Sequence, residues 1–416
     1  MLVQKNILEG NVINNMRIVE LAGELGAYTG KLFADLGADV IRIESMEGDP
    51  TRLEKPFFKE IAGIENSLRY QYLNTNKKGI VLDIASPEGK EVFLKLIKTT
   101  DLLIESLPPG HLDSLGLGYE LLSVINPKLV HTAITPYGQF GPYKDYPFSD
   151  LTCLAMGGML YLAGNGDEKP VLVPDKQSFF QADLYAAYGS MVALINADMT
   201  SEGQYVDVSI QESVVTAQEN AIQGYDLEGR IRRGIGLVEA GNGTYKCQDG
   251  FVYIVASMGG NAYLWYPLVD WMIEEKIPGA EVLRGKEWGT PEHRKKEESI
   301  NYFKTVVEQF LVKYTKQYLY QEGQKRKVVI YPVNTPKDVF ENPQFNYRNF
   351  FKEMYSESVN GTITYPGSPY YLEKIPWELR SGAPAFGQHT AEVLKHLGYS
   401  ADDIKSFVKR GVSYVK

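Results

Sequence analysis

The sequence predicts an α/β protein built around a parallel sheet, and three observations support that fold class. Strand-like apolar runs alternate with helical patterns over the first 135 residues. Residues 32–44 read as a helix that passes through Gly37 into a buried strand. Residues 19–21 precede them with a second strand, which completes a βαβ unit. The strand ends and helix N-termini of such a unit are suited to a phosphate-bearing ligand.

The elements of the first half follow from apolar spacing and from helix caps. Ile80, Leu82 and Ile84 alternate as in a strand, and Ser86 with Pro87 begins a helix in which apolar residues recur at helical spacing. The expected strands are 19–21, 40–43, 79–84, 102–104 and 129–134. The expected helices are 29–36, the helix that begins at Ser86, and 121–125.

The second half predicts a continuation of this domain and then a smaller one. A helix over 178–196 is rich in small residues, and an alternating strand over 203–210 follows it. Residues 224–236 are interpreted as a linker, 241–254 as turns and strands of an α+β domain, and 390–412 as terminal helices. The predicted large domain is therefore 1–224 completed by 345–416, and the linker with the small domain spans 225–344.

Composition excludes several classes of protein. The 416 residues are 44% hydrophobic with a net charge of −9, which indicates a folded protein that does not bind nucleic acid. Cys153 and Cys247 are too few for a disulfide framework, and the five histidines lack ligand spacing, so no metal site is expected. No signal-type or membrane-spanning run is found, and we expect a cytoplasmic protein with no membrane contact.

Motifs with known chemistry are scarce. The chain has no phosphate-binding glycine-lysine motif, no nucleophilic serine turn, no zinc-binding histidine pair and no complete dinucleotide-binding glycine motif. Gly259 and Gly260 could close over a ligand or form an ordinary turn. Asn76 and Lys77 stand before a strand, where they could donate to a phosphate, but a solvated charge pair is equally ordinary.

An ordered set of segments resembles the class III CoA-transferase family, which includes the CaiB/BaiF proteins, formyl-CoA transferase and acyl-CoA racemases. The set covers nearly the whole chain, and its order makes it specific although each segment alone is weak. The segments are 36–44, 48–52, 74–83, 109–110, 115–119, 126–130, 137–142, 203–209 and 387–390.

This resemblance implies an interlocked dimer in which each chain has a Rossmann-like large domain and a smaller α+β domain. It also implies a CoA thioester and an organic acid as substrates, without a tightly bound cofactor. In the family an aspartate attacks the thioester to form a mixed anhydride and then an aspartyl-CoA thioester. The CoA contacts that the resemblance implies are Glu24, Leu25, Gly26, Arg42, Asn76, Lys77, Leu82 and Leu115.

The chain departs from the family at the nucleophile itself. Counting without gaps from 157–158 forward or from 203–204 backward places Phe179 where the aspartate usually stands. Phenylalanine cannot be acylated. Asp175 and Asp183 lie one helical turn to either side, so a shifted register would restore a nucleophile. Residues 22–26 and 106–110 also differ from the family pattern.

These departures predict a divergent member that resembles the aspartate-lacking subunit of heteromeric enzymes such as succinyl-CoA:benzylsuccinate CoA-transferase of anaerobic aromatic degradation. Its partner would be a homologous subunit that supplies the aspartate. Two alternatives stay open: a homomeric transferase that uses Asp183 or Asp175, and a CoA-binding protein without turnover. Racemase activity is disfavoured because no histidine and acid pair is identifiable, and the acid substrate is not readable from the sequence.

Overall fold

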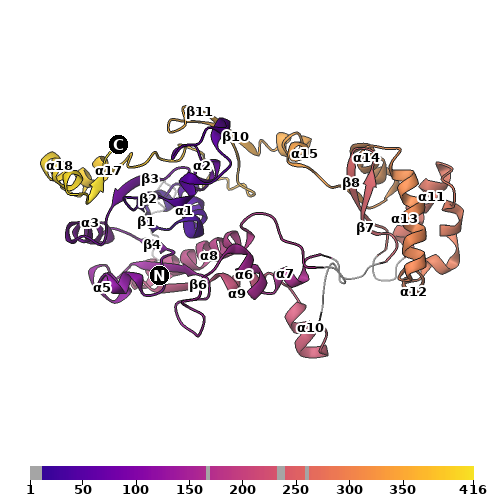
Figure 1. The fold of residues 1–416 in the computed structure, drawn as a ribbon, viewed down its shortest axis with the longest axis horizontal. Helices are drawn as coiled ribbons and strands as arrows, with labels where there is room; N and C mark the ends of the chain where they lie inside the picture. Colours follow the sequence, from indigo (N-terminus) through magenta and orange to yellow (C-terminus); the bar gives the residue numbers. More distant parts are fainter. Residues whose placement is uncertain (1–11, 165–168, 232–238, 258–261) are drawn as a thin grey trace, which may run out of the picture. The chain divides into compact units, whose positions relative to one another are not determined.

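The computed structural model describes residues 12–164, 169–231, 239–257 and 262–416. The chain divides into two compact units, shown in Figure 1. Of the described residues, 12–163, 169–231 and 349–416 belong to unit 1. Residues 164, 239–257 and 262–348 belong to unit 2.

Unit 1 is built on a seven-stranded sheet with the order β12-β3-β2-β1-β4-β5-β6. Neighbours from β3 to β6 pair in parallel, whereas β12 is antiparallel to β3. The strands are β1 Arg17–Leu21, β2 Asp39–Glu44, β3 Lys78–Leu82, β4 Leu102–Glu105, β5 Val130–Thr135, β6 Tyr205–Ser209 and β12 Ser413–Tyr414. The predicted parallel α/β sheet is thus confirmed, and its strand order reverses between β1 and β4.

Two predicted strands are longer than the observed ones. The strand expected over 79–84 ends at Leu82. The strand expected over 203–210 ends at Ser209, whose side chain accepts a hydrogen bond from the backbone N–H of Glu212 and so caps the next helix.

Side chains alternate between the two faces of the sheet, and each face has its own helices. Ile18, Val40 and Ile104 pack with helices α1 (Glu24–Leu36) and α8 (Gln177–Thr200) in one core. Val19 and Leu103, on the other face, pack with a second set of helices. These are α3 Pro87–Ile97, α5 Tyr119–Ile125, α17 Thr390–His396 and α18 Ala401–Lys409 (Figure 1).

The remaining elements of unit 1 are short. They are α2 Leu68–Leu73, α4 His111–Ser114, α6 Asp150–Met156, α7 Met159–Leu162, α9 Ile210–Thr216, α10 Ala221–Glu228, β10 Phe351–Ser356 and β11 Gly361–Pro366. Helix α10 corrects the predicted linker over 224–236, because residues 224–228 are helical.

Unit 2 has a three-stranded antiparallel sheet and its own core. The strands are β7 Asn242–Cys247, β8 Gly250–Val255 and β9 Ile330–Pro332, in that order. The helices are α11 Trp265–Glu274, α12 Pro291–Arg294, α13 Glu297–Leu311, α14 Lys316–Arg326, α15 Pro336–Phe340 and α16 Pro343–Tyr347. Buried Trp265, Trp271 and Phe310 contribute to the core. Gly259 and Gly260, considered above as a ligand loop, lie outside the described residues.

Three properties of the described part of the chain bear on function. Its helices are too short or too polar to cross a membrane. Its histidine, cysteine and acidic side chains form no cluster of three or more that could hold a metal ion. The two cysteines are buried and unpaired.

Candidate functional site

A cavity of 520 Å³ opens at the carboxyl edge of the unit 1 sheet. Its walls come from the ends of β1, β2 and β3 and from the segment after β4, so it spans the point where the strand order reverses. Ligands of open α/β sheets bind in this position, and the volume falls within the range of small-molecule sites. The fold therefore makes this cavity the candidate binding site.

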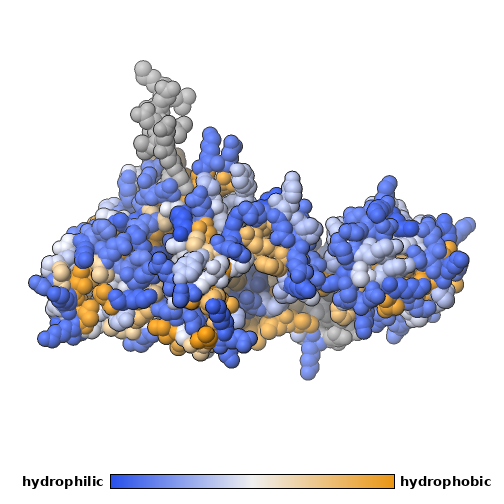
Figure 2. Space-filling view, turned by 90° about the horizontal axis from the view of Figure 1, so that it is seen from above, coloured by the Kyte–Doolittle hydropathy of each residue, from blue (hydrophilic) through white to orange (hydrophobic). Residues whose placement is uncertain are grey.

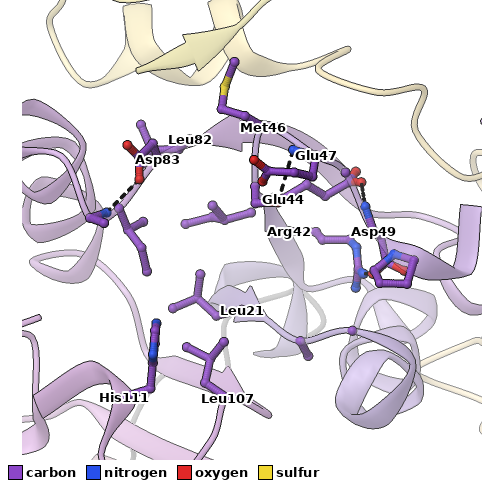
Figure 3. A pocket seen from close by; sticks show the side chains of 18 of the residues that line it. Leu21, Arg42, Glu44, Met46, Glu47, Asp49, Leu82, Asp83, Leu107 and His111 are labelled. Carbon is purple, nitrogen blue, oxygen red and sulfur yellow. Dashed lines mark hydrogen bonds and ion pairs between the residues drawn. The ribbon is translucent and has the colours of Figure 1, made fainter. Parts of the chain in front are cut away.

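The walls of this cavity combine apolar and acidic side chains. Figure 3 shows Leu21, Leu82 and Leu107 around the opening, with His111 beside Leu107. Leu115 completes the apolar part, so two of the residues predicted to contact CoA, Leu82 and Leu115, do line the cavity. The acidic lining residues are Glu44, Glu47, Asp49 and Asp83.

Arg42 also lines the cavity, but its guanidinium is committed to carboxylates. The side chain is 1% exposed, and Nη1 donates to Glu20 at 2.5 Å while Nη2 pairs with Asp49 (Figure 3). Asp49 in turn accepts from the backbone N–H and hydroxyl of Thr51. Arg42 thus fixes the loop after β2, and its predicted contact with CoA stays a prediction.

Arg52 also stabilises the loop after β2, through ion pairs with Glu44. It lies in a buried position, and Nε and Nη2 donate to the two oxygens of Glu44 at 2.7 Å each. Tyr70 contributes its hydroxyl, which lies 2.6 Å from Nη2. Bidentate pairing of this kind is strong and orients both partners. Glu44 and Asp49, which line the cavity, are therefore held by ion pairs that the sequence did not reveal.

Asn76 and Lys77 face the protein interior. The Lys77 ammonium is fully buried and donates to Glu20 at 2.8 Å and to the carbonyl of Ala27 at 2.7 Å. Burial lowers its pKa to about 8, although Glu20 opposes the shift. Asn76 donates to Asp35 at 2.6 Å. The interpretation of Lys77 as part of a solvated charge pair is wrong, and neither side chain lines the cavity.

The segment of Glu24, Leu25 and Gly26 forms a kink at the start of α1. Leu25 and Gly26 have non-helical dihedral angles, and Gly26 has φ of 91°, which favours glycine. A Cβ at position 26 would approach the Cβ of Ala22 to 2.8 Å. The kink explains why α1 begins earlier than the predicted helix over 29–36. Glu24 forms ion pairs with Arg69 and Lys176.

Asp183 of helix α8 accepts hydrogen bonds from the backbone of this kinked segment. Its carboxylate accepts from the backbone N–H of Gly26 at 2.8 Å and of Tyr28 at 3.2 Å, and the side chain is 1% exposed. Burial raises the pKa of Asp183 to about 8, although the two backbone hydrogen bonds lower it. Asp183 thus acts as the cap of the regular part of α1, and a carboxyl protonated at neutral pH is a poor nucleophile.

Asp175 belongs to an ion-pair cluster centred on Arg69. Arg69 contacts Asp175 at 2.7 Å, Glu24 at 2.8 Å and Glu54 at 3.1 Å. Burial acts to raise the pKa of Asp175, but the hydrogen bond and charge of Arg69 outweigh it and lower the pKa. Asp175 is about half exposed and ionised. It is therefore the more nucleophilic of the two candidates, although Arg69 occupies one of its oxygens.

Phe179 lies between these two carboxylates on the first turn of α8. Its ring is 7% exposed and packs near Phe148, with ring centroids 6.1 Å apart. The ammonium of Lys176 lies 5.5 Å from the centre of the ring and also contacts Glu24 at 3.1 Å. Glu24, Arg69, Lys176, Phe179 and Asp183 line one small cavity. Phe179 thus places an apolar ring among the charged side chains of this cavity.

Sequence reasoning missed two charged residues of this site, Arg69 and Lys176. Arg69 contacts Glu24 and Asp175, which are 45 and 106 positions away along the chain, so no local pattern marks it. The structure brings together Glu24, Asp175 and Asp183 from the predicted site. It does not bring Asn76 or Lys77 to either cavity.

Comparisons with known proteins identify the family of this chain. The model of CoA-transferase family III matches residues 13–390. Subunit BbsE of succinyl-CoA:(R)-benzylsuccinate CoA-transferase from Thauera aromatica is 43% identical over 408 residues, which are 98% of this chain and 99% of that protein. The alpha subunit of succinyl-CoA–L-malate CoA-transferase from Chloroflexus aurantiacus is 28% identical over 96% of this chain and 92% of its own.

A solved structure agrees with the sequence comparisons. The crystal structure of a CAIB/BAIF family protein from Brucella suis superposes with a TM-score of 0.82 at 26% identity, covering 93% of this chain and 99% of that one. The fold defines an α/β protein of the CaiB/BaiF type. The chain belongs to CoA-transferase family III.

Proposed function

We propose that this chain is one subunit of a CoA-transferase that moves CoA from an acyl-CoA such as succinyl-CoA to a carboxylic acid. A homologous subunit would supply the nucleophilic aspartate. The observation that carries the proposal is Phe179, a side chain without nucleophilic chemistry that lines a small cavity together with Glu24, Arg69 and Lys176. The two relatives support it, because both are named as subunits of CoA-transferases that use succinyl-CoA.

The proposed chemistry follows the family pattern. The partner's carboxylate attacks the thioester carbonyl, the C–S bond breaks, and CoA leaves as a thiolate while a mixed anhydride forms. The thiolate then attacks the enzyme's acyl carbon, which releases the first acid and leaves CoA as a thioester on the enzyme. The second acid then attacks the enzyme-bound CoA thioester, and the same steps in reverse transfer CoA to it. No external oxidant or reductant is needed.

The cavity at the carboxyl edge of the sheet is the proposed place for CoA on this chain. Its apolar wall of Leu21, Leu82 and Leu115 suits the adenine ring and the pantetheine arm. The strand order supports a Rossmann-like description of unit 1. We assign CoA binding to the predicted large domain, 1–224 with 345–416, and propose that the chain interlocks with its partner as the family does.

A cytoplasmic location completes the proposal. The two cysteines are buried and unpaired, as expected of a protein from a reducing compartment. The alternative of a homomeric transferase rests on Asp175, whose pKa is lowered and whose carboxylate is about half exposed. The alternative of a CoA-binding protein without turnover rests on Phe179 alone.

The decisive experiment is intact-mass spectrometry after incubation with succinyl-CoA and hydroxylamine, on the chain alone and with a co-purified homologous subunit. Hydroxylamine attacks the activated acyl carbon, displaces the leaving group and leaves a stable hydroxamate on the aspartate. We expect the modification on the homologous subunit and not on this chain. Modification of Asp175 or Asp183 here would establish the homomeric enzyme, and the variants Asp175→Asn and Asp183→Asn would assign it.

A result without any modification would distinguish the third alternative, a CoA-binding protein without turnover, from the two transferases. If the chain binds CoA in a calorimetric titration but neither subunit is modified, the chain is a binding protein and the proposal fails.

A further inference from the structure

Three buried side chains of unit 1 carry opposite charges and contact one another. Most charged side chains of a folded protein stay at its surface, and hydrophilic residues predominate on the face shown in Figure 2. Glu20, Arg42 and Lys77 differ, because their side chains are 0%, 1% and 0% exposed. Burial of charges is unfavourable unless they are paired. The proposed transfer chemistry uses none of the three.

Glu20 of β1 joins the two cations. Its Oε1 accepts a hydrogen bond from Nη1 of Arg42 at 2.5 Å, and its Oε2 accepts one from the Lys77 ammonium at 2.8 Å. Helix α1 leaves space for this carboxylate at Gly30, where a Cβ would lie 1.8 Å from Oε2 of Glu20 and 3.4 Å from Cε of Lys77. The ion pair is therefore packed directly against α1.

One chain of contacts leads from Glu20 to the cavity at the sheet edge. Arg42 lines that cavity and pairs through Nη2 with Asp49, another lining residue (Figure 3). Asp49 accepts from the backbone N–H of Thr51 at 2.6 Å, so it holds the loop after β2. Glu20 thus orients the guanidinium that holds one wall of the cavity.

A second chain of contacts leads from Lys77 to the start of α1. The ammonium donates to the carbonyl of Ala27 at 2.7 Å. Ala27 stands between Gly26 and Tyr28, whose backbone N–H groups donate to Asp183. Asp183 in turn lines the small cavity. Lys77 therefore holds a carbonyl of the same segment whose N–H groups hold Asp183.

We propose that Lys77 is a positioning residue for both cavities, acting through Glu20 on the cavity at the sheet edge and through the Ala27 carbonyl on the small one. This role rests on the proposed function, because the first cavity is taken to hold CoA. The ammonium is fully buried and lines neither cavity, so its effect on CoA is indirect.

Hydrogen exchange of the full chain without ligand tests both chains of contacts. Lys77→Met keeps the length of the side chain but removes the ammonium. We expect the backbone amides of residues 26–28 and 49–51 to exchange about tenfold faster or more than in wild type, because each segment loses a charged hydrogen-bond network that holds it. The thermal unfolding midpoint sets a temperature at which both proteins are folded.

The matched control is Lys31→Met. Lys31 is a second buried lysine, 4% exposed, which pairs with Asp35 at 2.8 Å and contacts Thr75. None of these three residues lines either cavity. We expect Lys31→Met to lower the unfolding midpoint too, but to leave exchange at both segments within about twofold of wild type. Equal acceleration in both lysine variants would indicate a general loss of stability and would overturn the proposal.

A second pair of variants separates the two chains of contacts and stays informative if Lys77→Met does not fold. Glu20→Gln with Lys77→Met removes both charges, and neutral replacement of a buried ion pair is often tolerated. Compared with Glu20→Gln alone, the double variant should exchange faster at 26–28 and equally at 49–51, because the contact with Arg42 is already weakened. Unchanged exchange at 26–28, or further acceleration at 49–51, would overturn the proposal.

Calorimetric titration with CoA connects these positions to binding. We expect Lys77→Met to weaken the CoA affinity by about tenfold or more, and Lys31→Met to leave it within about twofold. Equal affinities of wild type and Lys77→Met would overturn the positioning role at the sheet edge. A wild-type chain that does not bind CoA would refute the proposed function instead, and exchange at 49–51 would still decide whether Lys77 positions this loop.

Discussion

Replacement of Asp183 separates a structural role of this carboxylate from a catalytic one. In the Asp183→Ala variant the backbone N–H groups of Gly26 and Tyr28 lose their acceptor. The Gly26 donor is buried and the Tyr28 donor partly so. A buried donor without a partner costs about 1–3 kcal/mol. Two donors, one of them partly solvated, give a loss of about 3 kcal/mol in the stability of the α1 start.

Hydrogen exchange of peptides from α1 measures this loss locally. A difference of about 3 kcal/mol corresponds to about a hundredfold loss of protection. Asp183→Asn keeps one acceptor oxygen, so its loss should be near about 1 kcal/mol. Asp198→Ala is the control, because Asp198 is an exposed acid on the same helix. Its effect should lie within about 0.5 kcal/mol.

The raised pKa of Asp183 also predicts how the stabilities of wild type and of Asp183→Asn depend on pH. Between the ordinary value of 3.8 and about 8 the folded state holds a proton on Asp183 that the unfolded state has released. The contribution of this group to the free energy of unfolding is therefore complete below pH 3.8 and is lost as the pH rises through about 8. In urea unfolding, the difference in the free energy of unfolding between wild type and Asp183→Asn should become smaller as the pH rises over that range.

One result would refute the structural interpretation. If Asp183→Ala keeps the protection of α1 and the unfolding transition of wild type, yet abolishes a hydroxylamine-dependent modification of this chain, Asp183 is the nucleophile and the cap is incidental.

Two further perturbations test the cavity at the sheet edge. Arg52→Ala leaves the buried Glu44 without its bidentate partner, and we expect a loss of about 3–5 kcal/mol in urea unfolding, whereas Arg326→Ala at a partly exposed pair should cost less than about 1 kcal/mol. An unchanged unfolding midpoint for Arg52→Ala would contradict the buried network. Leu115→Trp fills part of the cavity and should weaken CoA binding by about tenfold or more in calorimetry, while Leu121→Trp on the outer side of α5 should not. Equal CoA affinities of Leu115→Trp and Leu121→Trp would show that CoA binds elsewhere.

Local sequence patterns were sufficient for the sheet. Alternating apolar residues and glycine turns act within a few positions, so the predicted strands around Val19, Ile41, Ile80 and Leu103 agree with β1 to β4. The start of α1 was not predictable in this way. It depends on the kink at Gly26 and on an acceptor 157 positions away on α8.

The main error in the prediction of the site concerned the orientation of charged side chains. The sequence shows Lys77 beside Lys78 before a strand, and the two look alike. In the structure Lys77 is buried against Glu20, 57 positions away, whereas Lys78 is partly exposed and pairs with Asp39. Strand alternation sends adjacent residues to opposite sides, but only the three-dimensional arrangement reveals which side holds the carboxylate.

The charges around position 179 explain why an apolar side chain suits this chain. Two cations, Arg69 and Lys176, already face three carboxylates. The carboxylates are Glu24, Glu54 and Asp175. An aspartate at 179 would be a fourth acid among them, and like charges at short range disfavour ionisation and destabilise the fold. We therefore expect Phe179→Asp to destabilise unit 1, and a second change, Glu24→Gln, to recover part of that loss. A double-mutant cycle by urea unfolding measures the coupling. Strictly additive effects would show that the cluster does not oppose a carboxylate there, and the absence of the nucleophile would then need another physical cause.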